Sequence, residues 1–450
     1  MKEWDWELHS DADKFLKDVV NDFRNSCEAC ARLAGRIESS TSTRFFDWVD
    51  HIVISASKAD PQVLMKLGFK EQEACSEQGA RVFRHDACTL FPVLFSDGRK
   101  TEIAIKVEEL SEFQKMSGVP GAISGSFNSP LRRLRIHDRD GFALSAVERR
   151  GSAGFIVVDA KDIDPYDAAY KMFLTRRRDF LQLEKGLEDF ERQVVSDLDW
   201  LDKARVADAF IRAERTYWAS RNAAAKVQKA RQNVLGLGFA NADHHTLRSS
   251  RSQFGHLIRI LKMMGMVPRE RFYAGAQAGW GAQVLEQPDC DMVVFAEVDL
   301  SPDEQTRDLS MEEMTDLDRL GSVGLWTELH GESVLEAGFH HVALRLDFER
   351  ARRDLRMKGM ETMKPFSSFS FLKQAFTKGD PWKVGSRRVS EAEARGGITS
   401  DQAARFNSTG AIGSHLEIMQ RDHGFKGFNQ DSVSAIIRES DQRAPQERGA

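Results

Sequence analysis

Three segments of this 450-residue chain begin in the same way, with a strand-like run that carries histidine. The runs are Val49–Ile54, Ala242–Leu247 and Phe339–Leu344, and a short segment of helical character follows each one. Repeated β-α-β-β-β modules that start on such a strand indicate an internally duplicated fold. We therefore predict an α+β protein in which paired β-α-β-β-β modules form a half-barrel and a long helical insertion interrupts the chain.

The remaining segments are ordered around these runs. Apolar spacing predicts one long helix over residues 11–38, and a segment dense in Ala, Leu, Arg, Glu and Lys predicts two or three long helices over 166–233. A glycine pair, Gly236 and Gly238, marks the end of this helical segment. We predict an N-terminal helix with a degenerate β-α-β-β module, a helical segment, a metal-binding catalytic domain and a C-terminal tail, over residues 1–160, 161–238, 239–430 and 431–450.

Composition excludes several function classes. The chain has 64 Lys and Arg residues against 69 Asp and Glu residues, a net charge of -5, so it lacks the cationic field that a phosphate-backbone binder needs. No apolar run reaches the roughly 18 residues that a membrane-spanning helix needs. Five scattered cysteines are typical of a reduced protein. We predict a cytoplasmic protein with neither a nucleic-acid nor a membrane partner.

The second histidine run places several polar side chains on one strand face. Residues two apart on a strand share a face, so His244, Thr246 and Arg248 are expected to line one cavity. If two modules pair, His341 can meet His244 across that cavity. Two imidazoles and one carboxylate on one face of an octahedral metal ion are the ligands of non-haem Fe(II) oxygenases. The pattern therefore predicts such a site, for which a carboxylate is still required.

Two glutamates compete for the third ligand position. Residues 387–396 fit a last strand that carries Glu393, and they also fit a short helix capped by Ser390, which would leave this carboxylate on the surface. Residues 416–421 alternate in polarity and predict a strand that carries Glu417. Periodicity alone slightly favours Glu417.

Other histidines are expected to have structural roles. His245 and His340 neighbour the two candidate ligands and should point to the opposite strand face. His51 and Glu148 resemble two ligands of a further site in the first region, but the sequence offers no third partner there. We expect His51 and Glu148 to be relics or packing residues of a duplicated module.

The C-terminal half resembles a known family. In order along residues 240–425, its motifs are similar to those of the 2-oxoadipate dioxygenase/decarboxylase (hydroxyglutarate synthase) family, which belongs to the vicinal-oxygen-chelate superfamily. The matching segments are His244-His245-Thr246-Leu247-Arg248, Met264-Gly265-Met266-Val267-Pro268, Phe272-Tyr273, Ala278-Gly279, His340-His341, Ser368-Phe369, Arg388-x-x-Glu391-x-Glu393-x-Arg395-Gly396, Thr399 and Phe406-Asn407-Ser408-Thr409-Gly410.

This resemblance implies an enzyme that uses Fe(2+) and O2 to convert a 2-oxo acid such as 2-oxoadipate to a shortened 2-hydroxy acid and CO2. The site residues that it implies are His244, His341 and Glu393 as metal ligands and Arg248, Phe406 and Asn407 as substrate-binding residues. The protein departs from the family pattern in three respects. It lacks the long insertion after the glutamate motif, it has Ser370 where lysine is usual, and its first 235 residues have no counterpart in the match.

A second resemblance leads to an alternative. Leu416–Arg421 and Gly424-Phe425 are similar to the end of 4-hydroxyphenylpyruvate dioxygenases, in which a glutamate of this segment binds iron, so Glu417 would replace Glu393. The substrate would then be an aromatic 2-oxo acid. A catalytically silent ligand-binding module is the third reading. Each enzyme reading implies a small 2-oxo acid and O2 as partners, and a homo-oligomer is left open.

Overall fold

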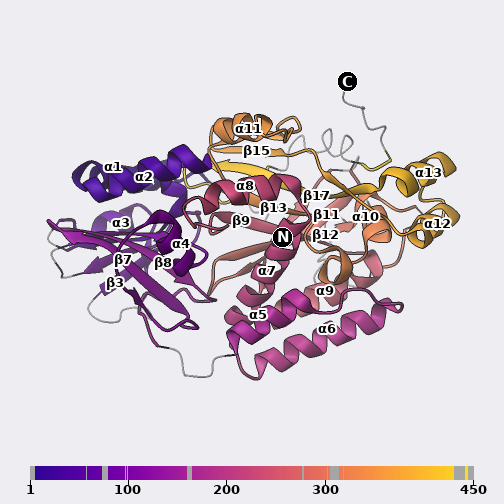
Figure 1. Cartoon of the computed structure of the whole chain (residues 1–450), viewed down its shortest axis with the longest axis horizontal. Coiled ribbons are helices and arrows are strands. Elements are labelled where there is room, and N and C mark those ends of the chain that lie inside the picture. The colour runs from indigo at the N-terminus through magenta and orange to yellow at the C-terminus, as the bar shows by residue number, and fades with distance from the viewer. Residues whose placement is uncertain are drawn as a thin grey trace.

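The computed structural model describes residues 6–56, 58–72, 80–96, 98, 100–159, 165–275, 278–301, 303–304, 314–317, 319–429 and 441–443. The chain forms two large sheets, with helices packed against each (Figure 1). Among the described residues, no helix has both the length and the apolar character needed to cross a bilayer. The predicted tail at 431–450 lies outside the described residues, apart from 441–443.

The first sheet contains two β-α-β-β-β modules. Its strand order is β2-β3-β4-β1-β5-β8-β7-β6. The strands are β1 (Val49–Ser55), β2 (Lys70–Glu71), β3 (Ala80–Arg84), β4 (Val93–Ser96), β5 (Thr101–Lys106), β6 (Ile123–Ser124), β7 (Leu131–Arg139) and β8 (Phe142–Arg149), with the module helices α3 (Gln62–Lys66) and α4 (Leu110–Ser117). The prediction of a single β-α-β-β module here is wrong, because the region that starts at β5 forms a second module.

The second sheet repeats this arrangement. Its strand order is β10-β11-β12-β9-β13-β17-β15-β14, and β16 pairs with β17 beside it. The strands are β9 (Ala242–Arg248), β10 (Val267–Tyr273), β11 (Trp280–Gln287), β12 (Met292–Asp299), β13 (His341–Arg345), β14 (Ser367–Phe369), β15 (Leu372–Phe376), β16 (Asp380–Trp382) and β17 (Ala411–Arg421). The module helices are α9 (Arg251–Met263) and α11 (Phe348–Arg356).

Both sheets join their modules in the same way. The first strands of the paired modules, β1 with β5 and β9 with β13, are antiparallel neighbours, and each is parallel to the last strand of its own module. This shared order confirms the predicted fold class of paired β-α-β-β-β modules.

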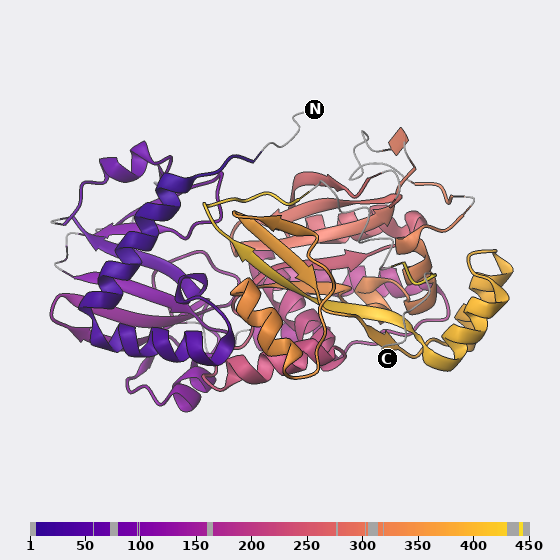
Figure 2. The ribbon, with the colours of Figure 1, turned by 90° about the horizontal axis from the view of Figure 1, so that it is seen from above.

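Helices cover one face of each sheet. Two helices, α1 (Ser10–Ser26) and α2 (Glu28–Thr41), pack on the first sheet through a continuous apolar cluster. The predicted single helix over 11–38 is thus two helices, because the backbone at Cys27 is extended, with φ of -120° and ψ of 100°. Figure 2 shows these helices lying across the first sheet.

The helical segment covers the second sheet. It forms four helices, where two or three are predicted: α5 (Tyr166–Thr175), α6 (Leu183–Leu198), α7 (Lys203–Ser220) and α8 (Ala223–Asn233). Their apolar residues share one large core with α9, α11 and the strands of the second sheet. α7 also pairs with the loop after β5 in the first half, since Arg215 and Arg212 bind Glu108 and Glu109. The helical segment therefore joins the two halves.

Three further helices lie beyond the strands of the second sheet. α10 (Ser322–His330) and a single π-helical turn (Ser333–Ala337) precede β13, and α12 (Ser386–Ala394) and α13 (Ser400–Thr409) lie between β16 and β17. Apolar residues of α10, α12 and α13 form their own cluster. Figure 1 shows α12 and α13 at the end of the molecule opposite the first sheet.

Candidate metal centre

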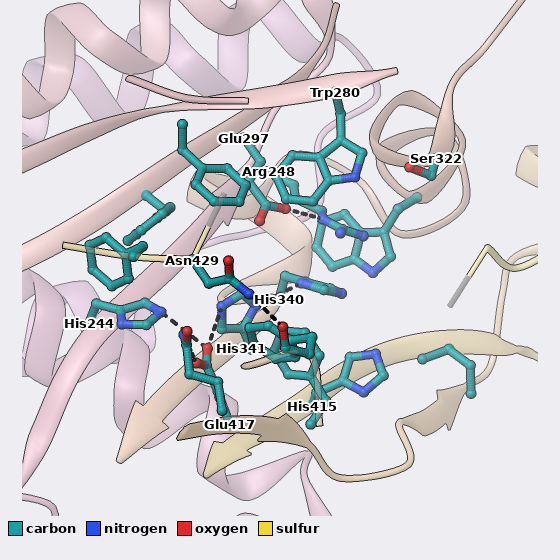
Figure 3. Close-up of a pocket in the computed structure, with 18 of the residues that line it drawn as sticks. His244, Arg248, Trp280, Glu297, Ser322, His340, His341, His415, Glu417 and Asn429 are labelled. Carbon is teal, nitrogen blue, oxygen red and sulfur yellow. Dashed lines mark hydrogen bonds and ion pairs between the residues drawn. The ribbon is translucent and has the colours of Figure 1, made fainter. Parts of the chain in front are cut away.

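Three neighbouring strands bring His244, His341 and Glu417 together on one face of the second sheet. His244 on β9, Ala343 on β13 and Glu417 on β17 lie in register across the strands. His341 lies two residues before Ala343 and so faces the same side. Because the middle strand contributes only the methyl group of Ala343 to the row, there is room between His244 and Glu417. Figure 3 shows the three side chains converging.

The geometry of this cluster fits one metal ion. Glu417 Oε2 lies 3.2 Å from His244 Nε2 and 3.3 Å from His341 Nε2. Two ligand atoms at about 2.1 Å from one ion and at right angles to each other are about 3.0 Å apart. One ligand atom from each of the three residues lies within 4.8 Å of the others, and the three side chains are buried. Among the described residues, this is the one cluster that could hold a metal ion.

The two candidate histidine ligands differ in how their surroundings act on a positive charge. Burial lowers the pKa of His341 well below its ordinary range, and the nearby charges of His244 and Arg248 act in the same direction. Burial also acts on His244, but the carboxylates of Glu417 and Asp243 outweigh it and raise the pKa of this imidazole. A positive charge beside Glu417 is thus favoured at His244, and a divalent cation bound there would compete with protonation of this imidazole.

Each candidate ligand is held by a second polar group. Asp243 accepts hydrogen bonds from Arg345 and Arg421 and lies 3.2 Å from His244 Nδ1. Gln374 Nε2 donates to Glu417 Oε1 at 2.8 Å, and His340 Nδ1 lies 3.0 Å from His341 Nδ1, the ring nitrogen that does not face Glu417. Such partners orient metal ligands and raise their basicity.

Glu393 does not join the cluster. Residues 386–394 form α12 rather than a strand, because Val389 and Ala392 are spaced for burial on one side of a helix. The Glu393 carboxylate is half-buried and accepts a hydrogen bond from Ser400 at the start of α13. The position expected for Glu393 is thus wrong, and the structure places the competing residue, Glu417, with the two histidines.

The cluster opens into a cavity of about 80 Å³, which has room for several water molecules. Four imidazoles, of His244, His340, His341 and His415, line its lower part in Figure 3, with Glu417 beside them. Half of the other lining residues are aromatic, and the rings belong to Phe272, Trp280, Phe295, Trp326, Phe366, Phe376 and Phe428. The candidate metal centre therefore lies at one end of a cavity whose wall combines aromatic rings with polar side chains.

The end of the cavity away from the cluster carries Arg248, as predicted from its strand position. Its Nε donates to Glu297 Oε2 at 2.7 Å, and its guanidinium carbon lies 5.5 Å from the centre of the Trp326 ring. Burial raises the pKa of Glu297, although the charge of Arg248 opposes this shift. Sequence reasoning missed Glu297, for which the only signal is an acid that follows a run of apolar residues in strand β12.

Two other predicted positions differ in the structure. Phe406 and Asn407 lie on α13, where Phe406 packs into the cluster shared with α10 and α12 and Asn407 is exposed, so neither lines the cavity. His340 does line it, and its Nδ1 lies 3.0 Å from His341 Nδ1. The prediction that His340 faces the opposite side assumes that His340 belongs to the strand. It does not, because β13 begins at the next residue.

His245 lies on the opposite face, as expected. Its ring packs against Phe339 at 5.1 Å, and its Nε2 lies 3.5 Å from Arg215. Burial lowers its pKa well below the ordinary value. His245 therefore belongs to the contact between β9 and the helical segment.

The first sheet repeats the frame of the site but not its ligands. His51 pairs with Ala104, and Ala104 pairs with Ser145 on the next strand. His51 therefore occupies the position of His244, and Ser145 stands where the second sheet has Glu417. Asp50 contacts His51 Nδ1 and Arg149, as Asp243 contacts His244 and Arg421. Glu148 is bound instead to Arg132 and Arg150. The two residues thus form no common site.

Comparison with known proteins does not assign this chain to a family. No model of a protein family matches the chain, and no curated protein matches it. A mutant of 4-hydroxymandelate synthase from Streptomyces coelicolor is similar over 88% of this chain and 98% of its own, with 12% identity and a TM-score of 0.29.

Two further solved structures are similar at the same level. YdcJ from Shigella flexneri, which includes domain DUF1338, matches 62% of this chain and 83% of its own, with 13% identity and a TM-score of 0.26. A xylose isomerase-like TIM barrel/4-hydroxyphenylpyruvate dioxygenase fusion protein matches 91% of this chain and 56% of its own, with 11% identity and a TM-score of 0.23. TM-scores this low carry no argument about the fold, so we assign the fold from the order of the strands in the two sheets alone.

Proposed function

We propose that the protein is an Fe(II)-dependent oxygenase that decarboxylates a 2-oxo acid. The observation that carries this proposal is the buried cluster of His244, His341 and Glu417 at one end of a cavity. Two histidines and one carboxylate on one side of an ion leave the other side open, which is the ligand set of non-haem Fe(II) oxygenases. Bound Fe(II) would supply open positions for the 2-oxo acid and for O2, which couples loss of CO2 to oxygenation of the shortened acid.

The residues of the chain have separate tasks in this proposal. Asp243 and Gln374 hold His244 and Glu417 in place through hydrogen bonds. The aromatic wall excludes bulk water from the reacting end of the acid, which strengthens electrostatic contacts there. Arg248 contacts the far end of the substrate from the same strand as His244.

Two substrate classes have support from different observations. Arg248 in the cavity supports a dicarboxylate such as 2-oxoadipate, because a guanidinium can bind a distal carboxylate with two parallel hydrogen bonds. The ring-lined wall supports an aromatic 2-oxo acid such as 4-hydroxyphenylpyruvate, because aromatic rings pack well against one another.

The proposal is tested by O2 uptake and CO2 release. Protein loaded with Fe(II) without oxygen is mixed with oxygenated buffer that contains 2-oxoadipate or 4-hydroxyphenylpyruvate. We expect CO2 release with at least one acid, in step with O2 uptake, and none in Glu417→Ala. Iron-loaded protein that consumes no O2 with either acid would contradict the proposal and leave the silent ligand-binding module as the better reading.

A further inference from the structure

The cavity end that lies away from the metal centre carries a buried ion pair. Arg248 and Glu297 are partners in register on β9 and β12, and their side chains are only 11% and 3% exposed. Among the described residues, Glu297 is the one carboxylate that pairs with Arg248. The cation that could bind a distal carboxylate is thus already matched by an anion of the chain.

Two neutral polar groups of the same cavity have no partner. Trp280 Nε1 and Ser322 Oγ are buried and have no hydrogen-bond partner in the described part of the chain. Both residues line the cavity, and Figure 3 shows them on the side of Arg248 and Glu297, away from Glu417. A buried polar group without a partner costs stability, so these two groups are suited to a ligand that supplies one.

The charged groups of the cavity are balanced without any charge at the far end of the substrate. A divalent ion with Glu417 and the carboxylate of a bound 2-oxo acid sums to zero, and Arg248 with Glu297 also sums to zero. A second substrate carboxylate would enter beside Glu297 in a site that water does not screen. A hydroxyl or amide group there could accept from Trp280 or Arg248 and donate to Glu297.

We infer that Glu297 is a specificity-determining residue, which makes the far end of the cavity select 2-oxo acids with an uncharged hydrogen-bonding group and reject those with a distal carboxylate. This inference rests on the proposed function, because it concerns the same cavity. It assigns Arg248 to a neutral group of the substrate rather than to a second carboxylate.

The test compares three ligands on wild-type protein loaded with Fe(II) without oxygen. Chelation of the ion by a 2-oxo acid gives a charge-transfer absorption band, and its titration gives the dissociation constant. The ligands are 4-hydroxyphenylpyruvate, phenylpyruvate, which lacks the hydroxyl group, and 2-oxoadipate. We expect 4-hydroxyphenylpyruvate to bind at least about tenfold more tightly than either of the other two.

Two variants separate the contributions of charge and hydrogen bonding. In Glu297→Gln the charge of Arg248 is no longer balanced, so 2-oxoadipate should bind at least about tenfold more tightly than to the wild type, whereas phenylpyruvate should change less than about threefold. In Trp280→Phe an aromatic ring remains but the indole N–H is lost, so the advantage of 4-hydroxyphenylpyruvate over phenylpyruvate should fall. Glu286→Gln, on β11 outside the cavity, is the matched control and should leave all three constants unchanged.

The outcomes distinguish this inference from the proposed function. If the acids bind but wild-type protein prefers 2-oxoadipate, or if Glu297→Gln leaves the ligand preference unchanged, the inference about Glu297 is wrong and the proposed function stands. If none of the acids changes the spectrum of the iron-loaded protein, both are wrong. The wild-type comparison alone decides the matter if a variant does not fold.

Discussion

Asp243 links the candidate metal centre to the rest of the second sheet. Its carboxylate accepts from Arg345 Nε at 2.9 Å and Arg421 Nε at 3.0 Å, and it lies 3.2 Å from His244 Nδ1. It lies at an irregularity in the pairing of β9 with β13, which lets a residue next to His244 reach the same imidazole. We assign it a positioning role toward His244.

The role of Asp243 predicts a change in metal affinity. Asp243→Asn keeps the shape of the side chain but removes the charge, so iron affinity should fall by about 10- to 100-fold. Competition with a chelator of known affinity measures this change. Asp50→Asn is a matched control, because Asp50 contacts His51 and Arg149 in the same way in the first sheet. Equal iron affinities in the two variants would refute the role.

At this scale the sequence predicts the histidines better than the acids. His244 and His341 can be placed because both lie in repeated strand entries, where alternation determines which side chains share a face. Glu297 has no such repeat, and its pairing with Arg248 depends on β12 lying beside β9, a long-range contact. Phe406 and Asn407 are implied only by the resemblance to a family, and in the structure both lie on α13, outside the cavity.

Among the elements, β13 depends on the residue that ends the π-helical turn before it. Gly338 has φ of 73° and ψ of -163°, a conformation that is nearly restricted to glycine. A Cβ atom at this position would lie 2.8 Å from the Tyr217 ring. The chain therefore needs glycine here to direct His341 into the cavity.

The conformation of Gly338 predicts a coupled loss of stability and metal binding. Gly338→Ala should lower the free energy of unfolding by roughly 1 to 3 kcal/mol and should also weaken iron binding, because β13 begins three residues later. Gly141→Ala is the control, since Gly141 has φ of 78° with nothing near its Cβ position. Denaturant unfolding and iron titration measure both effects. Unchanged iron affinity in Gly338→Ala would contradict the account of β13.

The type of an element is hardest to predict where the spacing of apolar residues fits both a helix and a strand. Residues 387–396 match a strand and a helix equally, and only their packing against α10 and α13 selects the helix. The break between α1 and α2 has no glycine or proline, and both helices face the same sheet, so their apolar spacing continues across Cys27.

On the scale of the whole molecule, buried ion pairs join the two halves. Glu108, in the loop after β5, binds Arg215 of α7 at 2.9 Å and accepts from the backbone N–H of Phe239. Burial raises the pKa of Glu108, but the charges of Arg215, Lys229 and Arg212 outweigh it and lower the pKa to about 2. The folded protein therefore favours the charged form of Glu108 more strongly than the unfolded chain does.

This shift in the pKa of Glu108 predicts that the free energy of unfolding falls at low pH. Since the folded pKa lies below the ordinary value of 4.5, the contribution is complete above pH 4.5 and is lost as the pH falls toward about 2. Glu108→Gln should lower the free energy of unfolding at pH 7 by about 3 kcal/mol at most, and the difference from the wild type should vanish near pH 2. Glu112→Gln, at an exposed position of α4, is the control. A difference that persists at pH 2 would contradict this assignment.

The duplicated architecture could be predicted from the sequence, but its extent could not. Three module starts carry histidine and are therefore visible, whereas the fourth, at β5, has Glu102 and Ala104 in the corresponding positions. Its second strand, β6, has only two residues and gives no periodic signal. The structure thus contains four modules in two sheets, and among the described residues only the second sheet has a complete set of candidate ligands.

The iron content of three proteins tests the central claim most directly. Wild-type protein, Glu417→Ala and Glu393→Ala are loaded with Fe(II) without oxygen, freed of unbound metal, and analysed for iron and protein. We expect about one iron per chain in the wild type and in Glu393→Ala, and a loss of most of it in Glu417→Ala. Full iron content in Glu417→Ala, or a loss confined to Glu393→Ala, would contradict the assignment of the metal centre to His244, His341 and Glu417.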